Sequence, residues 1–146
     1  MSSQTFQILN PNYVELVEEI FAKQGLMALL DASLSAVSPG HVIIEMPSSK
    51  KVTQQHGFIH AGVLTSIVDT ACGAAAATLM PPRSNVLTIE YKVNFLSPAR
   101  GVKAIAVGRV LRPGSSVTVC QGEVFMADSK GKRKLCATML ATMIGR

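Results

Sequence analysis

The segment from Ala61 to Pro82, AGVLTSIVDTACGAAAATLMPP, is apolar and rich in alanine, and Asp69 is its only charged residue. We interpret residues 60–79 as a long central helix that Pro81-Pro82 terminate, because proline lacks the backbone N–H and fixes φ. An ionised carboxylate on such a helix is costly to desolvate unless a partner or a reaction uses it. Asp69 is therefore a candidate general base or nucleophile. A carboxylate that reaches the helix surface or accepts a backbone hydrogen bond is the alternative.

The turn before this helix, His60-Ala61-Gly62, supplies backbone N–H groups at the helix N-terminus, where they carry positive partial charge. Aimed at a substrate carbonyl, such groups stabilise the oxyanion of an acyl-transfer intermediate by about 3–4 kcal/mol per donor. A tight helix cap without a ligand is the other interpretation. Gln54, in the loop ahead of the helix, can orient a carbonyl or a water, or be an ordinary solvated glutamine.

The spacing of these two features constrains the site. Eight residues separate Ala61 from Asp69, which is about 12 Å along a helix. A single carbonyl cannot contact both positions of one chain. If both act on one substrate, they belong to two chains whose helices run antiparallel across a two-fold axis. The spacing thus predicts a site at a dimer interface, with two sites in each dimer.

Periodic and alternating patterns predict the elements around this helix. Residues 11–29 have a helical pattern, with Asn10 as a plausible cap and Gly25 as its end or interruption. Strands are expected at residues 30–37, 41–46, 87–95, 102–111, 117–127 and 134–144. One apolar helix against an antiparallel sheet is an α+β fold in which the sheet wraps the helix, and alanine together with Gly73 permits the close approach.

The strict alternation of the 87–95 segment predicts a half-buried strand, with Leu87, Ile89 and Tyr91 on one face and Thr88 and Glu90 on the other. Solvent exposure is the default for Thr88 in this pattern. The alternative is that Thr88 faces the interface site.

Composition favours one folded domain over residues 1–146, with 48% hydrophobic and 16% charged residues. A chain this apolar is expected to bury surface against copies of itself. The net charge of +5 comes from scattered lysines and arginines without a nucleic-acid-binding motif, so no nucleic acid partner is expected. A small polyphosphate ligand is the sharper alternative, because it needs only two or three basic residues.

Several other classes of protein are not expected. Cys72, Cys120 and Cys136 lie in apolar runs without CxxC spacing, which is typical of reduced core cysteines in a cytoplasmic protein. No secretory signal is visible, and Asp69 near the middle of residues 61–80 argues against a membrane span. No metal site is expected, because His56 and His60 lack an acidic partner at ligand spacing, and no GxSxG motif indicates a serine nucleophile.

The pattern Gln54-x-x-Gly57-x-x-His60-Ala61-Gly62, followed by Asp69-Thr70-Ala71, resembles the hotdog-fold acyl-CoA thioesterases of the phenylacetate-degradation (PaaI-like) type, within the hydroxybenzoyl-CoA thioesterase superfamily. The resemblance covers about residues 10–146, and Leu96-Ser97-Pro98-Ala99 is also typical. In two departures, Ala61 replaces the first glycine of His-Gly-Gly and Gln54 replaces the commoner asparagine. They add a methyl group beside the carbonyl and extend the side-chain amide by about 1.5 Å.

The resemblance implies a role for each matching residue. Asp69 becomes the general base or nucleophile, the Ala61 amide the oxyanion hole with Gly62 beside it, and Gln54 and Thr88 assist the water or the thioester. Candidate contacts to the substrate, including CoA, are His60, Glu90, Phe95, Arg112, Gly114, Ser115 and Ser116. The implied assembly is a dimer with a continuous sheet, doubled to a homotetramer. CoA is part of the substrate, so no separate cofactor is implied.

Together these features predict a cytoplasmic acyl-CoA thioesterase that hydrolyses the thioester to a free acid and CoA. Two alternatives stay open: a non-catalytic acyl-CoA-binding protein, which has no need of Asp69, and an enoyl-CoA hydratase, which requires an Asp and a His in one site. The acyl group is not fixed by the sequence, because the depth of an apolar tunnel depends on packing around residues such as Phe58, Met80 and Phe95.

Overall fold

The structure, a computed structural model, describes residues 4–146. Helices α1 (Tyr13–Ala22) and α2 (Gly25–Leu29) precede a hairpin of β1 (Ser33–Ser38) and β2 (His41–Pro47). A 3-10 turn, η1 (Lys50–Val52), then leads to the central helix α3 (Ala61–Ala77), and the remaining strands are β3 (Val86–Phe95), β4 (Lys103–Arg112), β5 (Val117–Ala127) and β6 (Arg133–Gly145). The expected order of elements is confirmed, with the first helical segment interrupted just before Gly25.

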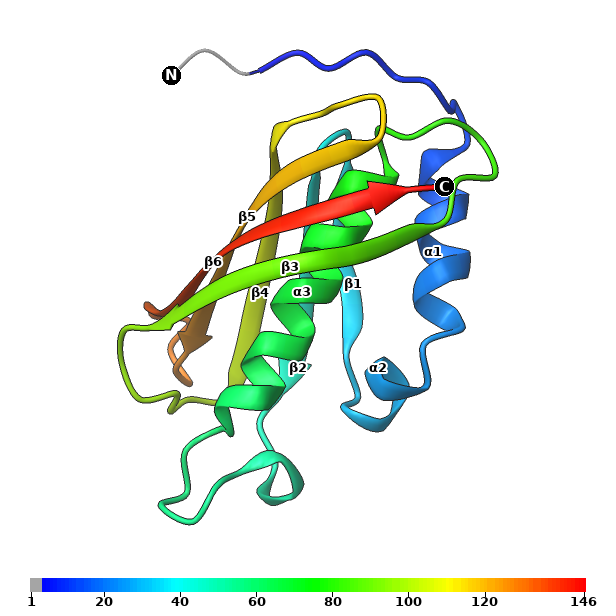
Figure 1. Ribbon diagram of the computed structural model, residues 1–146. Coiled ribbons are helices and arrows are strands. Elements are labelled where there is room, and N and C mark those ends of the chain that lie inside the picture. Colours follow the sequence, from blue (N-terminus) through cyan, green and yellow to red (C-terminus); the bar gives the residue numbers. More distant parts are fainter. Residues whose placement is uncertain (1–3) are drawn as a thin grey trace.

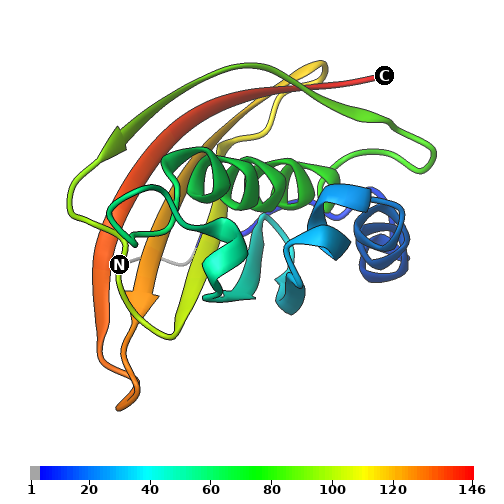
Figure 2. The ribbon, with the colours of Figure 1, turned by 90° about the horizontal axis from the view of Figure 1, so that it is seen from below.

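The strands form one antiparallel sheet in the order β1-β2-β4-β5-β6-β3. The sheet curves around α3, and α1 and α2 lie beside the helix where the sheet leaves it uncovered (Figures 1 and 2). β3 is an edge strand, although it follows α3 directly in the chain. Its outer edge has no strand partner within residues 4–146.

The start of α1 differs from the expectation. Asn12, and not Asn10, is the N-cap residue, and the helix begins at Tyr13. The Asn10 side chain instead accepts a hydrogen bond from the Asn12 N–H at 3.0 Å. This short turn around Pro11 uses the asparagine side chain before the helix starts, because such side chains readily bond the backbone two residues ahead.

Close contact between α3 and the sheet forms the core. The helix is 17 residues long and buries, among others, Leu64, Ile67, Val68, Ala71, Cys72, Ala75 and Ala76. A Cβ at Gly108 would lie 2.3 Å from the Ala71 backbone, and one at Gly122 would lie 2.4 Å from the Val68 side chain. These strand glycines permit the close approach. The expectation that Gly73 does so is wrong, because its nearest neighbour is 3.9 Å from an added Cβ.

The three cysteines are free and buried, as expected. Burial raises the pKa of the Cys72 thiol, and it raises that of Cys120 to about 12. The Cys120 Sγ lies 3.5 Å from the Cys72 carbonyl oxygen, in the contact between β5 and α3. Both thiols therefore act as small apolar core groups. Among residues 4–146, no helix is both long and apolar enough to cross a membrane.

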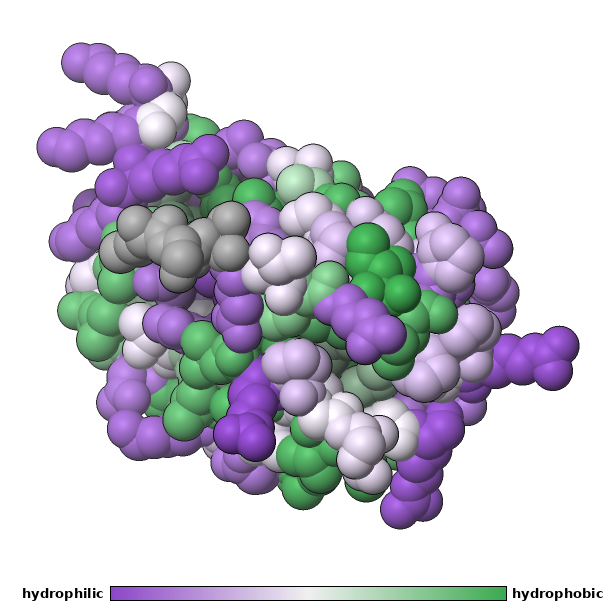
Figure 3. All heavy atoms as spheres, turned by 90° about the horizontal axis from the view of Figure 1, so that it is seen from above, coloured by the Kyte–Doolittle hydropathy of each residue, from purple (hydrophilic) through white to green (hydrophobic). Residues whose placement is uncertain are grey.

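The prediction of a half-buried β3 is wrong in two respects. The residues Leu87, Ile89, Tyr91 and Phe95 are 59%, 53%, 45% and 47% exposed. A bulge between Thr88 and Glu90 also shifts the register against β6, so that Tyr91 pairs with Ala141 and Thr88 with Met143. Because the extra residue resets the alternation, Thr88 and Tyr91 both face α3. Other apolar patches appear between hydrophilic side chains on the face seen from above (Figure 3).

Replacing Gly108 with alanine should destabilise the fold strongly. The added methyl group meets the α3 backbone, which cannot rotate away as a side chain can, so we expect the free energy of unfolding to fall by about 2–4 kcal/mol. Urea unfolding monitored by circular dichroism measures the change. Gly25→Ala is the matched control, since a Cβ at Gly25 meets nothing within 4 Å. Equal stability of the two variants would contradict the proposed contact.

Candidate active site

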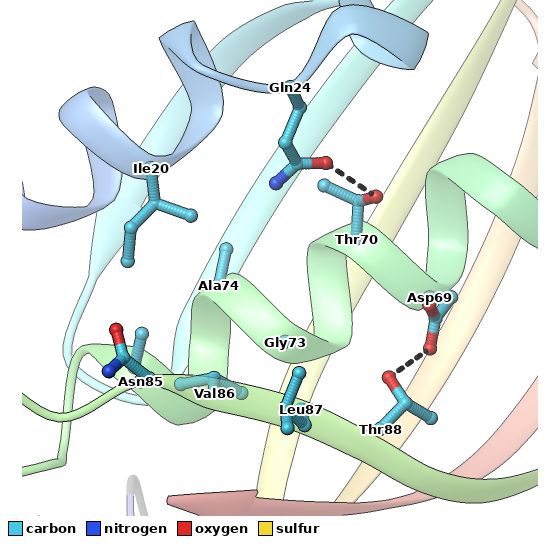
Figure 4. Close-up of a pocket in the computed structure, with 11 residues that line it drawn as sticks. Ile20, Gln24, Asp69, Thr70, Gly73, Ala74, Asn85, Val86, Leu87 and Thr88 are labelled. Atoms are coloured by element: carbon cyan, nitrogen blue, oxygen red, sulfur yellow. Dashed lines mark hydrogen bonds between the residues drawn. The ribbon is translucent and has the colours of Figure 1, made fainter. Parts of the chain in front are cut away.

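Asp69 lies in the middle of α3, on the side of the helix that the sheet does not cover. Its Oδ1 accepts a hydrogen bond from the Thr88 hydroxyl on β3 at 2.9 Å (Figure 4). Thr88 is held in turn by Met143 of β6, whose sulfur is 3.3 Å from the same hydroxyl oxygen. The carboxylate is thus fixed between the central helix and the edge strand.

The electrostatic setting of Asp69 differs from that of a surface carboxylate. Partial burial raises the pKa of its carboxyl above the ordinary value, while the Thr88 hydrogen bond lowers it by a smaller amount. In the described part of the chain, residues 4–146, no lysine, arginine or histidine lines the two pockets that contain Asp69. A half-buried carboxylate with a raised pKa and one positioning hydroxyl is suited to general-base or nucleophilic chemistry.

The N-terminus of α3 is organised by the His60 side chain. His60 is the N-cap residue, and its Nδ1 accepts a hydrogen bond from the Gly62 N–H at 2.9 Å. The Ala61 N–H, in contrast, has no hydrogen-bond acceptor within residues 4–146. The helix therefore presents one free amide at Ala61, whereas the Gly62 amide is already used. His60 is a cap in this structure, and its predicted contact with substrate stays a prediction.

Gln54 is turned toward its own loop. Its Oε1 accepts hydrogen bonds from the backbone N–H groups of His56 and Phe58, which leaves the Nε2 amide group as the free donor. Gln54, Ala61 and Phe95 line one pocket of about 430 Å³ beside the start of α3. The structure thus brings together three of the residues that the sequence indicated, at the helix end that carries the free amide.

Asp69 and Ala61 do not meet in one chain. Asp69 opens instead into a groove of about 560 Å³ along α3, together with Gly62, Ser66 and Tyr91. The rise of an α-helix puts the Ala61 and Asp69 backbones about 12 Å apart, so a single thioester carbonyl cannot contact both within one protomer. The two halves of the predicted site therefore belong to one helix but line separate pockets.

Two groups of predicted residues lie away from Asp69. Glu90 accepts a hydrogen bond from the Thr142 hydroxyl, on the face of the sheet opposite to α3. Arg112, Gly114, Ser115 and Ser116 lie in and next to the exposed β4–β5 loop, at the C-terminal end of α3 (Figure 1). A single protomer does not bring these residues to the carboxylate, and their contacts with substrate stay predictions.

Residues that the sequence did not indicate also line the site. Gln24, between α1 and α2, accepts a hydrogen bond from the Thr70 hydroxyl at 3.3 Å and lines two pockets that contain Asp69 (Figure 4). Tyr91 reaches the groove because of the β3 bulge. For Gln24, the only signal in the sequence is the polar Gln24-Gly25 pair within an otherwise periodic helical segment. For Tyr91 there is no signal, because strict alternation places it on the face opposite to Thr88.

Similarity to known proteins agrees with this architecture. Residues 56–132 match the profile of the Thioesterase superfamily. A thioesterase family protein from Silicibacter pomeroyi has a crystal structure with a TM-score of 0.89 and 41% identity, covering 91% of this chain and 97% of that one. The PaaI protein of the Escherichia coli phenylacetic acid degradation operon, with 17% identity, shares the fold at a TM-score of 0.79 over 93% of this chain and 94% of that one.

Two relatives with assigned names extend the similarity. A Saccharolobus solfataricus protein named as an esterase is 34% identical over 118 residues, which are 80% of this chain and 84% of that protein. The 1,4-dihydroxy-2-naphthoyl-CoA hydrolase of Escherichia coli is 25% identical over 119 residues, 82% of this chain and 85% of that one. The chain thus belongs to the thioesterase superfamily, and the expected hotdog-type α+β fold is confirmed.

The raised pKa of Asp69 gives a prediction for stability. An acid whose pKa is higher in the folded than in the unfolded state destabilises the fold progressively as the pH rises through those two values. Asp69→Asn keeps an oxygen acceptor for Thr88 and removes the charge. We expect the variant to be more stable than wild type at pH 7, with the difference shrinking below about pH 4. Urea unfolding across this range measures it, and a difference independent of pH would contradict the assignment.

Proposed function

We propose that this protein is an acyl-CoA thioesterase whose active site is shared between two protomers. The observation that carries the proposal is the Asp69 carboxylate, half-buried on α3 and held by Thr88, in a chain whose helix N-terminus also presents a free Ala61 amide. Membership of the thioesterase superfamily supports thioester hydrolysis. The name of a relative, a 1,4-dihydroxy-2-naphthoyl-CoA hydrolase, supports a CoA thioester as the substrate class.

The edge of β3 supports the two-chain arrangement. β3 ends the sheet, its outer edge has no strand partner within residues 4–146, and four of its large apolar side chains are close to half exposed or more. Long apolar edge strands invite pairing with another chain. Antiparallel pairing of β3 with its copy across a two-fold axis would extend the sheet and bring the two α3 helices face to face. A further doubling to a tetramer stays a prediction.

In the proposed dimer, the Ala61 N–H of one protomer donates a hydrogen bond to the thioester carbonyl oxygen near Asp69 of the other. The Asp69 carboxylate either takes a proton from the attacking water or attacks the carbonyl carbon itself, so it must be ionised in both routes. The oxyanion of the tetrahedral intermediate receives the Ala61 hydrogen bond. Collapse of this intermediate breaks the carbon–sulfur bond and releases the CoA thiolate. When water is the nucleophile, the product is the free acid; when Asp69 is the nucleophile, the product is a mixed anhydride, which water then hydrolyses to the free acid and the Asp69 carboxylate.

Nearby groups have supporting roles in this mechanism. Thr88 donates to one carboxylate oxygen of Asp69, which also lines the groove along α3. The free Nε2 of Gln54 is available as a second donor in the pocket that contains Ala61. Because the carboxylate and the amide come from different chains, the site is complete only when the protein dimerises.

Steady-state hydrolysis of an acyl-CoA panel with thiol detection tests the activity. We expect Asp69→Ala and Asp69→Asn to lower kcat by at least about 100-fold, because the catalytic group is lost. The pH dependence of wild-type kcat/KM should show an acid limb above the ordinary aspartate pKa, since the raised pKa governs ionisation. Asp31→Asn, at an exposed aspartate, is the control. Unchanged turnover in both Asp69 variants would refute the proposed role.

Ala61→Pro tests the oxyanion donor separately. Ala61 is the first residue of α3, where proline is well tolerated, and His60 before it has the extended conformation that proline requires, with φ −60° and ψ 136°. The substitution therefore removes one N–H and keeps the helix. We expect kcat to fall about 100- to 1000-fold without a large change in thermal unfolding. Ala61→Gly keeps the N–H and should remain active; equal loss in both variants would point away from the amide.

A further inference from the structure

A cavity begins at Asp69 and extends away from the groove in which the proposed chemistry takes place. It has a volume of about 480 Å³ and is enclosed by α1, α3 and the start of β3 (Figure 4). Asp69 and Thr88 lie at one side of it, and the cavity follows α3 as far as Ala77. The eight steps along the helix from Asp69 to Ala77 correspond to about 12 Å.

Gly73 has no structural reason to be a glycine. A glycine inside a helix is less stable than an alanine, because it loses more backbone freedom on folding. At Gly108 and Gly122 the chain gains close packing in return, but a Cβ on Gly73 would meet only the Val86 Cγ1, at an ordinary contact distance of 3.9 Å. Gly73 also lacks the positive φ that favours glycine elsewhere in this chain. Its effect on the structure is the space that it leaves in the cavity.

The chemistry of the walls indicates what fills that space. Most of the lining is apolar, from Ile20 of α1, Ala74 and Ala77 of α3, and Val86 and Leu87. The Gln24 Oε1 accepts a hydrogen bond from the Thr70 hydroxyl, and the Gln24 amide group and Asn85 are the uncharged polar groups that remain on the wall. Within residues 4–146 no cationic side chain lines the cavity, so a phosphate or carboxylate has no charged partner there. An apolar chain that enters from the Asp69 side matches both the walls and the length.

We propose that this cavity binds the acyl part of the substrate, and that Gly73 determines the chain length that it accepts. The inference rests on the proposed function. An extended hydrocarbon chain advances by about 1.2 Å per bond, so a depth of about 12 Å accommodates a straight-chain acyl group of about eight to ten carbons. Gly73 acts on specificity alone, because it carries no side chain that contacts the thioester.

The test is the dependence of kcat/KM on acyl-chain length, from acetyl-CoA to longer straight-chain acyl-CoA esters. For wild type we expect a rise of about fourfold per methylene up to about eight to ten carbons, and no rise beyond. Gly73→Leu fills the space of several methylenes. It should lower kcat/KM for octanoyl-CoA about 50-fold or more and leave butyryl-CoA within about threefold.

Two further variants are controls for a general effect of substitution on folding. Gly73→Ala adds one methyl group without a clash, so it should keep or raise the melting temperature and shorten the preferred chain by one or two carbons. Gly25→Leu makes the matched change at a helical glycine that does not line the cavity and has open space around it. It should leave the chain-length profile as in wild type. An unchanged profile in both Gly73 variants would overturn the assignment.

Binding of non-hydrolysable S-alkyl-CoA thioethers separates this inference from the proposed function. Calorimetry should show tighter binding of S-octyl-CoA than of S-ethyl-CoA to wild type, and Gly73→Leu should remove that difference. If no acyl-CoA is hydrolysed but this pattern holds, the thioesterase proposal fails and the cavity assignment stands. If hydrolysis depends on Asp69 while neither turnover nor binding responds to Gly73→Leu, the cavity assignment fails and the thioesterase proposal stands.

Discussion

The close packing of α3 against the concave face of the sheet is the contact on which the other features depend. Gly108 and Gly122 let the helix backbone and its small side chains approach the strands, with neighbours 2.3 and 2.4 Å from where their Cβ atoms would be. One side of the helix is thereby fully buried. The opposite side, which carries Asp69 and Gly73, is left between α1 and the edge strand. The site exists because the sheet covers the helix only partly.

The same arrangement explains how a costly carboxylate is tolerated. Asp69 is buried enough for its pKa to rise, yet it accepts the Thr88 hydroxyl and opens into a groove. A fully buried position would neutralise the acid, and a fully exposed one would leave its pKa at the ordinary value. The edge position of β3 supplies both the hydroxyl and the unpaired apolar strand that we propose to be covered by a second protomer.

Features carried by local pattern were predictable from the sequence. The central helix follows from its apolar composition and from Pro81-Pro82, and the acid and the helix N-terminus follow from Asp69 and His60-Ala61-Gly62. Features that depend on distant contacts were not. Gly108 has no room for a side chain because the Ala71 backbone lies against it, whereas Gly73, for which the sequence predicts such close packing, has no neighbour that near.

The β3 bulge shows the same limit, because one extra residue turned Thr88 toward Asp69 against the simple alternation.

Whether Asp69 and Ala61 of different chains form one site is tested most directly by co-expressing Asp69→Ala and Ala61→Pro chains with different tags and purifying the mixed dimer. A shared site leaves one of the two sites with both groups intact, so the mixed dimer should recover about half of wild-type activity. Activity no higher than that of the two parent variants would contradict the account.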